Sequence, residues 1–358
     1  MSRLITIEAY TLRLPYCGFS EFVTRLGKGI AARSENLLKE HDLRFRFVVP
    51  KGMAGIFGPT VDYIEVTDAD VAEIERRPDW QSDIFHVPTQ YSTFRHMRRC
   101  RAKLVTVHDV NFIHNKHGLS LLVNWLRVRK RIRSAHYLAF ISRYAMADTL
   151  AHYKLSAPRR VIYNGVADTM AATESTPVEG LEPQRYLLHL SNMQPNKNVD
   201  LLVRMTDHLP ANIGPLVLAG TWAHASEKLR KLVAERPDRV KVLDSVSEAS
   251  KIWLYRNCRA FLFPSQCEGF GLPPLEAMSA GRPAFLSGLT SLPEVGGDAA
   301  YYFNRLEPES MARDLHTGLA HFDVDPYAEA RCRTRALQFN WEQCVDDYIA
   351  YYLDILAE

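Results

Sequence analysis

Short, largely apolar runs alternate with longer amphipathic stretches through the second half of this 358-residue chain. The runs are too short for helices and match buried strands, whereas the longer stretches have helical periodicity. Strands that alternate with helices predict a parallel, doubly wound sheet, so the expected fold class is α/β. The expected strands are 186–190, 216–219, 240–243, 260–263 and 284–287, and the expected helices between them are 199–209, 226–235, 247–257 and 273–280.

The first half has a similar order and predicts a second Rossmann-like domain. Residues 167–183 are rich in Ala, Thr, Glu and Pro without periodicity, which predicts a linker. We therefore expect an N-terminal domain over 1–166, a C-terminal domain over 184–340 and an amphipathic final helix over 341–358. The expected N-terminal strands are 4–10, 45–49, 83–87, 104–107 and 137–141, with helices near 21–40, 119–133 and 143–153.

Composition excludes several classes of protein. No window approaches the roughly 18 uninterrupted apolar residues of a membrane span, and the start lacks the apolar core of a signal peptide, which predicts a cytoplasmic protein. Six cysteines without C-x-x-C spacing indicate neither a zinc cluster nor a disulfide framework. The chain lacks aromatic residues arrayed for stacking and any recognisable nucleic-acid-binding module, which disfavours a nucleic-acid partner.

Basic residues concentrate in one segment, 95–133, which holds eleven Lys and Arg against one acid, Asp109. Such a local field would attract an anionic membrane surface or a phosphorylated acceptor. Attraction to lipid would make the protein peripheral on the cytoplasmic face of the membrane. A solvated helix face next to a basic loop explains the same residues equally well.

A glycine-rich turn between two carboxylates carries the clearest chemical signal. Glu268 precedes the turn Gly269-Phe270-Gly271, and Glu276 follows on the next expected helix. The glycines let backbone N–H groups approach an anion, and the helix N-terminus adds partial positive charge. The turn therefore predicts a diphosphate site with carboxylates for sugar hydroxyls. Pro274 occupies the place of the third glycine of a dinucleotide fingerprint, which disfavours a nicotinamide cofactor.

The sequence around this turn resembles the retaining, GT-B-type glycosyltransferases of family 4, of the bacterial polysaccharide and lipopolysaccharide group. Glu268 and Glu276 match the family signature of two glutamates with seven residues between them. Pro264-Ser265 and the runs 276–283 and 291–295 follow the same pattern in order, and the resemblance is dense from about 185 to 303. It implies two Rossmann-like doubly wound domains that face each other across a cleft. The donor would lie in that cleft, and the final helix would cross back to the N-terminal domain.

The resemblance also implies which residues bind the donor. Lys197 matches the family's phosphate-binding lysine, and Asn192 stands where the family commonly has an arginine. Backbone N–H groups of the turn would stabilise the departing diphosphate, and Glu276 would accept hydrogen bonds from the ribose. Gly18 matches one of two family glycines between the first strand and helix. The expected donor-binding set is Gly18, Asn192, Lys197, Gly269, Phe270, Gly271, Leu272 and Glu276.

Three residues are expected to act on the transferred sugar or its leaving group. Glu268 would stabilise a cationic anomeric centre, Lys197 the leaving diphosphate, and His108 would touch the donor sugar as the matching histidine does in related enzymes. Asp109, next to His108, is either an acceptor-side residue or structural. These residues also have ordinary interpretations. Glu268 could be a loop carboxylate, Lys197 a surface lysine and His108 a strand-end histidine. Glu276 could likewise be a glutamate on a helix surface.

A metal site is disfavoured by the spacing of the histidines. His108, His114 and His117 lie close together in the sequence, but no carboxylate or cysteine partner follows them at ligand spacing. Enzymes of the resembled fold do not normally need metal to bind a diphosphate. We therefore expect neither a metal nor a cofactor.

The expected function is a metal-independent, retaining transfer of a mannose- or glucose-like hexose. The donor would be a nucleotide-diphosphate sugar such as GDP-mannose or a UDP-hexose, and the acceptor a glycan or lipid-linked sugar in cell-surface polysaccharide synthesis. By the resemblance, the acceptor would attack the face that the leaving group vacates, with a phosphate oxygen taking its proton. Two alternatives stay open: a catalytically silent sugar-nucleotide-binding subunit and a GT-B epimerase.

Overall fold

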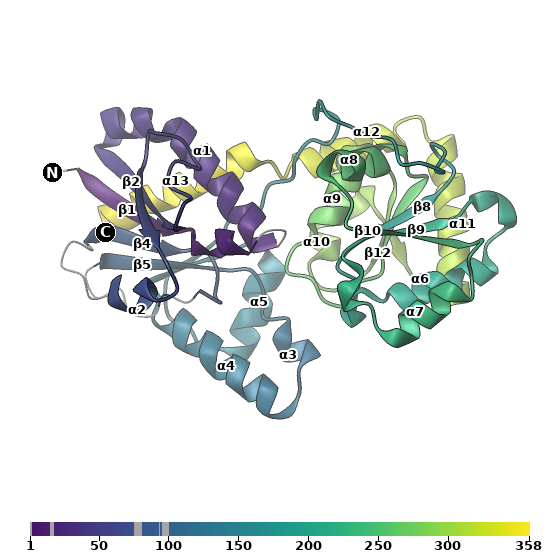
Figure 1. Cartoon of the computed structure of the whole chain (residues 1–358), viewed down its shortest axis with the longest axis horizontal. Coiled ribbons are helices and arrows are strands. Elements are labelled where there is room, and N and C mark those ends of the chain that lie inside the picture. The colour runs from purple at the N-terminus through teal and green to yellow at the C-terminus, as the bar shows by residue number, and fades with distance from the viewer. Residues whose placement is uncertain (1, 15–17, 75–80, 93, 95–99) are drawn as a thin grey trace. The chain divides into compact units, whose positions relative to one another are not determined.

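The computed structural model describes residues 2–14, 18–74, 81–92, 94 and 100–358. It divides the chain into two compact units, each built on its own sheet (Figure 1). The N-terminal unit comprises Met1–Gly165 together with Trp341–Glu358, and the second unit is Val166–Asn340.

The N-terminal unit is a seven-stranded parallel sheet in the order β3-β2-β1-β4-β5-β6-β7. Side chains alternate between two apolar clusters, because successive residues of a strand point to opposite faces. Ile84 belongs to one cluster, while Phe85 and Val87 belong to the other. The strands are β1 (Arg3–Glu8), β2 (Leu43–Pro50), β3 (Asp62–Val66), β4 (Ser82–Val87), β5 (Cys100–Val107), β6 (Tyr137–Phe140) and β7 (Arg159–Val161). The helices are α1 (Gly18–His41), α2 (Asp70–Ile74), α3 (Phe112–Asn115), α4 (Gly118–Arg133), α5 (Arg143–His152) and α13 (Trp341–Ala357).

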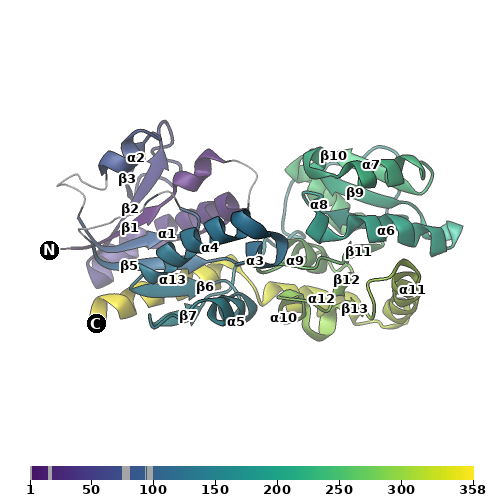
Figure 2. The same cartoon turned by 90° about the horizontal axis from the view of Figure 1, so that it is seen from below.

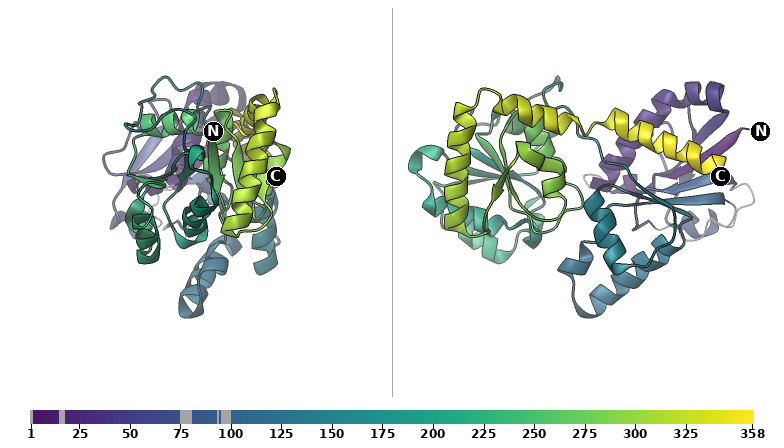
Figure 3. Two further views of the ribbon diagram at one scale, coloured as in Figure 1. Left: turned by 90° about the vertical axis from the view of Figure 1, so that its right-hand side faces the viewer. Right: turned by 180° about the vertical axis from the view of Figure 1, so that it is seen from behind.

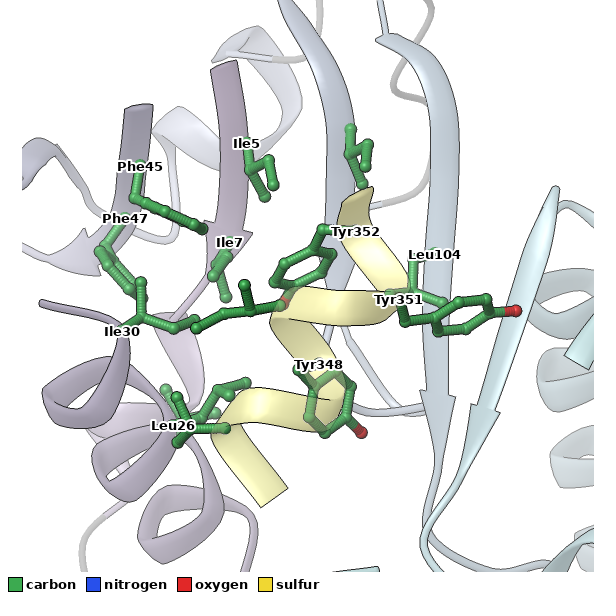
Figure 4. Close-up of a cluster of buried hydrophobic side chains, with 14 of the residues drawn as sticks. Ile5, Ile7, Leu26, Ile30, Phe45, Phe47, Leu104, Tyr348, Tyr351 and Tyr352 are labelled. Carbon is green, nitrogen blue, oxygen red and sulfur yellow. The ribbon is translucent and has the colours of Figure 1, made fainter. Parts of the chain in front are cut away.

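The C-terminal helix α13 packs beside α1 against the N-terminal sheet (Figures 3 and 4). Close packing requires Gly29, because a Cβ there would lie 2.4 Å from a methyl carbon of Val345. Two buried tyrosines of α13 also reach polar groups on the strands. The Tyr352 hydroxyl lies 2.6 Å from Nδ1 of His86, and the Tyr348 hydroxyl lies 2.9 Å from Oγ1 of Thr106. Without these bonds, the polar atoms would be buried in the apolar cluster without hydrogen-bond partners. The bonds therefore fix the position of α13 on the sheet.

The second unit is a six-stranded parallel sheet in the order β10-β9-β8-β11-β12-β13 (Figure 2). The strand order reverses between β8 and β11, which makes this pair the switch point of the sheet. The strands are β8 (Leu187–Leu190), β9 (Leu216–Gly220), β10 (Val240–Asp244), β11 (Ala260–Phe263), β12 (Ala284–Ser287) and β13 (Tyr301–Phe303). The helices are α6 (Val199–Met205), α7 (Glu227–Ala234), α8 (Glu248–Asn257), α9 (Leu272–Ser279), α10 (Leu292–Gly296), α11 (Pro308–Val324) and α12 (Ala328–Leu337).

The segment predicted as a linker, 167–183, falls inside the second unit. The backbone N–H of Thr169 donates to Oγ of Ser279 on α9 at 3.2 Å. The Arg256 guanidinium on α8 donates to the carbonyls of Thr169 and Ala172 at 2.5 and 2.6 Å. Side chains of α8 and α9 thus hold the start of the segment, which has neither a helix nor a strand of its own.

Within the described ranges, no helix combines the length and the apolar character that crossing a bilayer requires.

Two buried histidines predict how the N-terminal unit responds to acid. Burial lowers the pKa of His86 to about 3, with a further contribution from nearby His108, and burial lowers the pKa of His108 to about 4. Both pKa values lie below the usual value for histidine, so the unfolded chain binds more protons than the folded chain does. Stability is therefore lost as the pH falls through 6.5. Acidification from about pH 7 to about pH 5 should cost the unit about 2 kcal/mol for each histidine.

Urea unfolding of the His86→Gln variant tests this expectation. The acid-dependent loss should be smaller by about 2 kcal/mol in this variant, whereas His117→Gln, which alters an exposed histidine, should keep all of it. An unchanged pH dependence in His86→Gln would contradict the account.

Candidate functional site

The candidate residues of the second unit lie on loops that leave the switch point of its sheet. In a parallel sheet the carboxyl ends of neighbouring strands meet at one edge, which is where ligands bind in open α/β folds. The loop after β8 carries Asn192 and Lys197, and the loop after β11 carries Glu268 and the glycine turn. The sheet therefore brings residues about 70 positions apart to the same edge.

Two asparagines fasten these loops to each other. The Asn196 side chain donates to the carbonyl of Cys267 at 3.2 Å, and its own carbonyl accepts from the N–H of Gln266 at 2.8 Å. The Asn198 side chain donates to the carbonyl of Pro264 at 2.9 Å. Asn198 has a left-handed backbone, with φ of 53°, a conformation that asparagine tolerates better than most residues. The two loops consequently form one connected surface.

Lys197 and Glu268 form an ion pair across these loops. Lys197 Nζ donates to Glu268 Oε1 at 2.5 Å, and the two side chains are only 14% and 13% exposed. The Lys197 ammonium also lies 5.3 Å from the centre of the Phe263 ring. Because both charges are largely shielded from water, their attraction is stronger than at an open surface. The sequence placed these residues on different parts of the donor, and the structure brings them into contact.

A buried histidine lies at the base of the first loop. His189 Nδ1 is 2.8 Å from the carbonyl of Leu262, and its Nε2 is 2.8 Å from Oγ of Ser191. Burial lowers the pKa of His189 to about 4, the Leu262 carbonyl opposes that change, and the Lys197 charge adds to it. His189 is therefore neutral near neutral pH. The same Ser191 oxygen accepts from the N–H of Met193 at 3.0 Å, which sets the direction of the loop that carries Asn192.

The glycine turn is shaped by Gly271. This residue has φ of 126° and precedes the first residue of α9, and a Cβ there would lie 3.0 Å from a methyl carbon of Leu292. Pro273 and Pro274 have no N–H, so of the first three residues of α9 only Leu272 can donate a backbone hydrogen bond. The helix thus offers its dipole and one amide to an anion, fewer donors than a helix start without prolines.

The loop after β12 forms hydrogen bonds with the backbone of the turn. Ser291 Oγ donates to the carbonyls of Glu268 and Phe270, at 3.1 and 2.6 Å. The hydroxyl of Thr290 accepts from the N–H of Glu268 at 3.2 Å. Thr290 and Ser291 therefore hold both ends of the segment Glu268–Phe270.

Glu276 is held on α9 by two residues of α8. The Tyr255 hydroxyl donates to Oε2 at 2.8 Å, and Lys251 Nζ donates to Oε1 at 3.3 Å. Burial alone would lower the pKa of Lys251, but the Glu276 and Glu248 carboxylates raise it to about 12. Burial, together with Glu276, raises the pKa of Tyr255. Glu276 is therefore a fixed carboxylate. Sequence reasoning missed Lys251 and Tyr255, whose only signal is their spacing of four on one helix face.

His108, predicted to touch the donor sugar, belongs to the N-terminal unit and follows β5. Its Nε2 lies 2.8 Å from the carbonyl of Pro88, and its backbone N–H donates to Oε1 of Gln90 at 3.0 Å. The rings of Phe19 and Phe22 meet the imidazole edge to face, with centroids 4.8 and 5.0 Å away. His108 is buried and neutral at physiological pH, because burial lowers its pKa to about 4.

The other two N-terminal candidates lie beside these contacts. Gly18 is the first residue of α1, the helix that also carries Phe19. Asp109 accepts through its carbonyl from the Gln90 side chain at 2.7 Å, and its carboxylate accepts from the N–H of Asn111 at 3.0 Å. Asp109 therefore shapes the turn after β5.

Comparison with known proteins decides the class of enzyme. Residues 173–321, which contain Lys197 and both glutamates, match the family described as Glycosyl transferases group 1. This matched segment is a group 1 glycosyltransferase domain. The resemblance read from the paired glutamates is thereby confirmed, as is the prediction that the protein is an enzyme.

Relatives of this glycosyltransferase include two proteins of Escherichia coli. O-antigen chain mannosyltransferase B is 29% identical over 293 residues, which are 76% of this chain and 75% of that protein. The serotype-specific mannosyltransferase WbdA is 32% identical over 168 residues, 44% of this chain but only 20% of that longer protein.

A solved structure shares the fold of the glycosyltransferase. HepE of Anabaena, in complex with UDP and glucose, superimposes with a TM-score of 0.74 at 16% identity, over 98% of this chain and 99% of that one. The predicted GT-B class, with two Rossmann-like units, is confirmed.

A double-mutant cycle tests the Lys197–Glu268 pair. Lys197→Met leaves a shielded carboxylate without its partner and should destabilise the second unit by about 1–3 kcal/mol. Adding Glu268→Gln should restore part of that loss, which urea unfolding of the three variants would measure.

The pair Lys231–Glu227 on α7 is the matched control, because both side chains are highly exposed. Its coupling should stay within about 0.5 kcal/mol. Equal coupling in the two pairs would mean that Lys197 and Glu268 do not interact in solution as they do here.

Proposed function

We propose that this glycosyltransferase moves a mannosyl residue from a nucleoside-diphosphate donor to a glycan or lipid-linked acceptor of a cell-surface polysaccharide. The observation that carries the proposal is the Lys197–Glu268 pair beside the glycine turn at the switch point of the second sheet. The choice of mannose is supported by the two E. coli relatives, both of which are mannosyltransferases by name.

Donor binding would redistribute the charges of this pair. Without donor, Lys197 is neutralised by Glu268 at 2.5 Å. A diphosphate offers Lys197 a second anion, and a lysine that turns toward it leaves the Glu268 carboxylate able to face the sugar. Positive charge that develops at the anomeric carbon would then be stabilised by Glu268, while Lys197 and the start of α9 stabilise the departing phosphate.

Asn192 supplies no charge to this site, so the leaving group depends on one lysine where related enzymes commonly use two cations. Glu276, fixed by Tyr255 and Lys251, is suited to accept hydrogen bonds from the ribose. The proposed reaction needs no metal or cofactor, retains anomeric configuration and passes the acceptor proton to the leaving phosphate. Contact of His108 with the transferred sugar stays a prediction, and its neutral imidazole suits a hydroxyl partner.

Kinetics with GDP-mannose and UDP-glucose test the assignment of roles. Glu276→Gln should weaken donor binding about tenfold with little change in kcat, because its contacts are made equally in the ground state. Glu268→Gln should lower kcat by at least about a hundredfold and change donor affinity little, because its interaction grows with the developing charge. Glu248→Gln, which alters an exposed partner of Lys251, serves as control.

Two outcomes would overturn the proposal. Wild-type kinetics in both variants would remove the glutamates from the site. Donor binding without any transfer or donor hydrolysis would favour the silent binding subunit.

We also propose that α4 docks the enzyme on an anionic membrane surface. Four apolar side chains of α4, all between 45% and 76% exposed, recur at helical spacing on one face: Leu119, Leu122, Val123 and Leu126. The same helix carries the exposed cations Arg127, Lys130 and Arg133. An exposed apolar face beside cations is the pattern of a helix that lies in the lipid interface.

Some of the basic residues in segment 95–133 are buried and do not contribute to a basic surface. Arg131 is buried and donates to the carbonyl of Phe94, and Lys103 is buried and donates to Ser134 Oγ at 3.1 Å. Arg95, Arg98 and Arg99 lie outside the described residues. The membrane proposal therefore rests on α4 and its apolar face.

Sedimentation with vesicles tests this docking. Binding to anionic vesicles should exceed binding to neutral ones and should weaken with salt. Leu119→Ser with Leu122→Ser should lower the partition coefficient at least about tenfold, whereas Val324→Ser, an exposed apolar residue of the second unit, should not. Equal behaviour of the two variants, or no binding at low salt, would contradict the proposal.

A further inference from the structure

We propose that His114, Asp148 and His152 form a binding site for Zn²⁺ on the N-terminal unit. His114 Nε2 lies 3.0 Å from Asp148 Oδ2, and His152 Nε2 lies 3.5 Å from Asp148 Oδ1. The ligand atoms of all three side chains lie within 4.8 Å of one another. Two imidazoles and a carboxylate that converge on one point are a donor set typical of zinc.

The fold creates this convergence from two short helices. His114 lies in the last turn of α3, which follows β5, and Asp148 and His152 are four positions apart on one face of α5, which follows β6. Figure 1 shows α3 beside α5. The carboxylate comes 34 residues after His114, so the local spacing around His114 did not reveal it.

The distances to the carboxylate are close to those that the ion requires. Zinc at bonds of about 2.1 Å in tetrahedral geometry separates its ligand atoms by about 3.4 Å. Oδ1 of Asp148 lies 3.1 Å from Nε2 of His114 and 3.5 Å from Nε2 of His152, which brackets that value, and all the ligand atoms lie within 4.8 Å of one another. Asp148 is only 9% exposed and fixed on α5, whereas His114 and His152, at 39% and 35%, have the freedom to close on an ion. Their exposure also leaves the fourth position to water.

The donor set favours a late first-row divalent ion over Mg²⁺ or Ca²⁺, which prefer oxygen ligands. Zinc bound here would tie α3 to α5. None of the three residues belongs to the donor-binding set, so the proposal stands apart from the proposed transfer reaction.

Competition with a chromogenic chelator tests the site on the full chain after metal removal. We expect one Zn²⁺ per chain, with affinity at least about tenfold weaker in His114→Gln and in His152→Gln. His224→Gln, an exposed histidine of the second unit, is the matched control and should bind as the unaltered chain does. Zn²⁺ should raise the melting temperature of the unaltered chain and of the control, but not of the other two variants.

Both informative substitutions are at exposed side chains, and melting curves in chelator will show that the variants fold. Cobalt provides a second readout, because Co²⁺ in a low-coordinate imidazole–carboxylate site absorbs visible light more strongly than hydrated Co²⁺. Absence of stoichiometric binding to the unaltered chain would overturn the proposal. So would equal affinity in all three variants, and the cluster would then be a hydrogen-bonded trio.

Discussion

The Lys197–Glu268 ion pair joins the two loops on which the chemistry of the second unit depends. Its short contact forms only because β8 and β11 are neighbours at the switch point and because Asn196 and Asn198 bind the loops together. Two shielded charges in contact cost desolvation that their attraction must offset. A site that keeps such a pair can exchange one partner for a ligand of the same sign. The pair therefore links the stability of the empty loops to recognition of an anion.

A neutral imidazole lies near this charged pair. His189 stays uncharged because it is buried, so Lys197 and Glu268 are balanced by each other and not by the histidine beneath them. Glu276 has its own partners on α8, which separates the two glutamates electrostatically even though they share one motif. The N-terminal unit also contains buried, neutral histidines, His86 and His108. In both units buried imidazoles therefore act as hydrogen-bonding groups without charge.

The interior of both sheets could be predicted from the sequence, but three of their four edge strands could not. Apolar runs predict the central strands and the edge strand β10, and they miss the edge strands β3, β7 and β13. Edge strands bury less surface and carry polar residues, such as Arg159 and Arg160 in β7, so they lack an apolar run. The exposure of the apolar face of α4 could not be predicted either, because periodicity indicates an apolar stripe but not whether other residues cover it.

Local motifs likewise revealed only part of the candidate site. The turn, Lys197 and Glu276 follow from short patterns, and residues 173–321 confirm the family to which those patterns belong. Contacts between distant segments do not follow from such patterns. Lys251 and Tyr255 reach Glu276 from another helix, and Asp148 reaches His114 from α5. Arg131 shows the converse error, because a basic run does not reveal which of its members points inward.

A crystal structure of the protein with a nucleoside diphosphate would show directly whether Lys197 exchanges Glu268 for a phosphate. We expect Lys197 Nζ to leave Glu268 and to lie within hydrogen-bonding distance of a phosphate oxygen, close to the start of α9. A nucleotide bound elsewhere, or bound here with the 2.5 Å Lys197–Glu268 contact intact, would contradict this expectation.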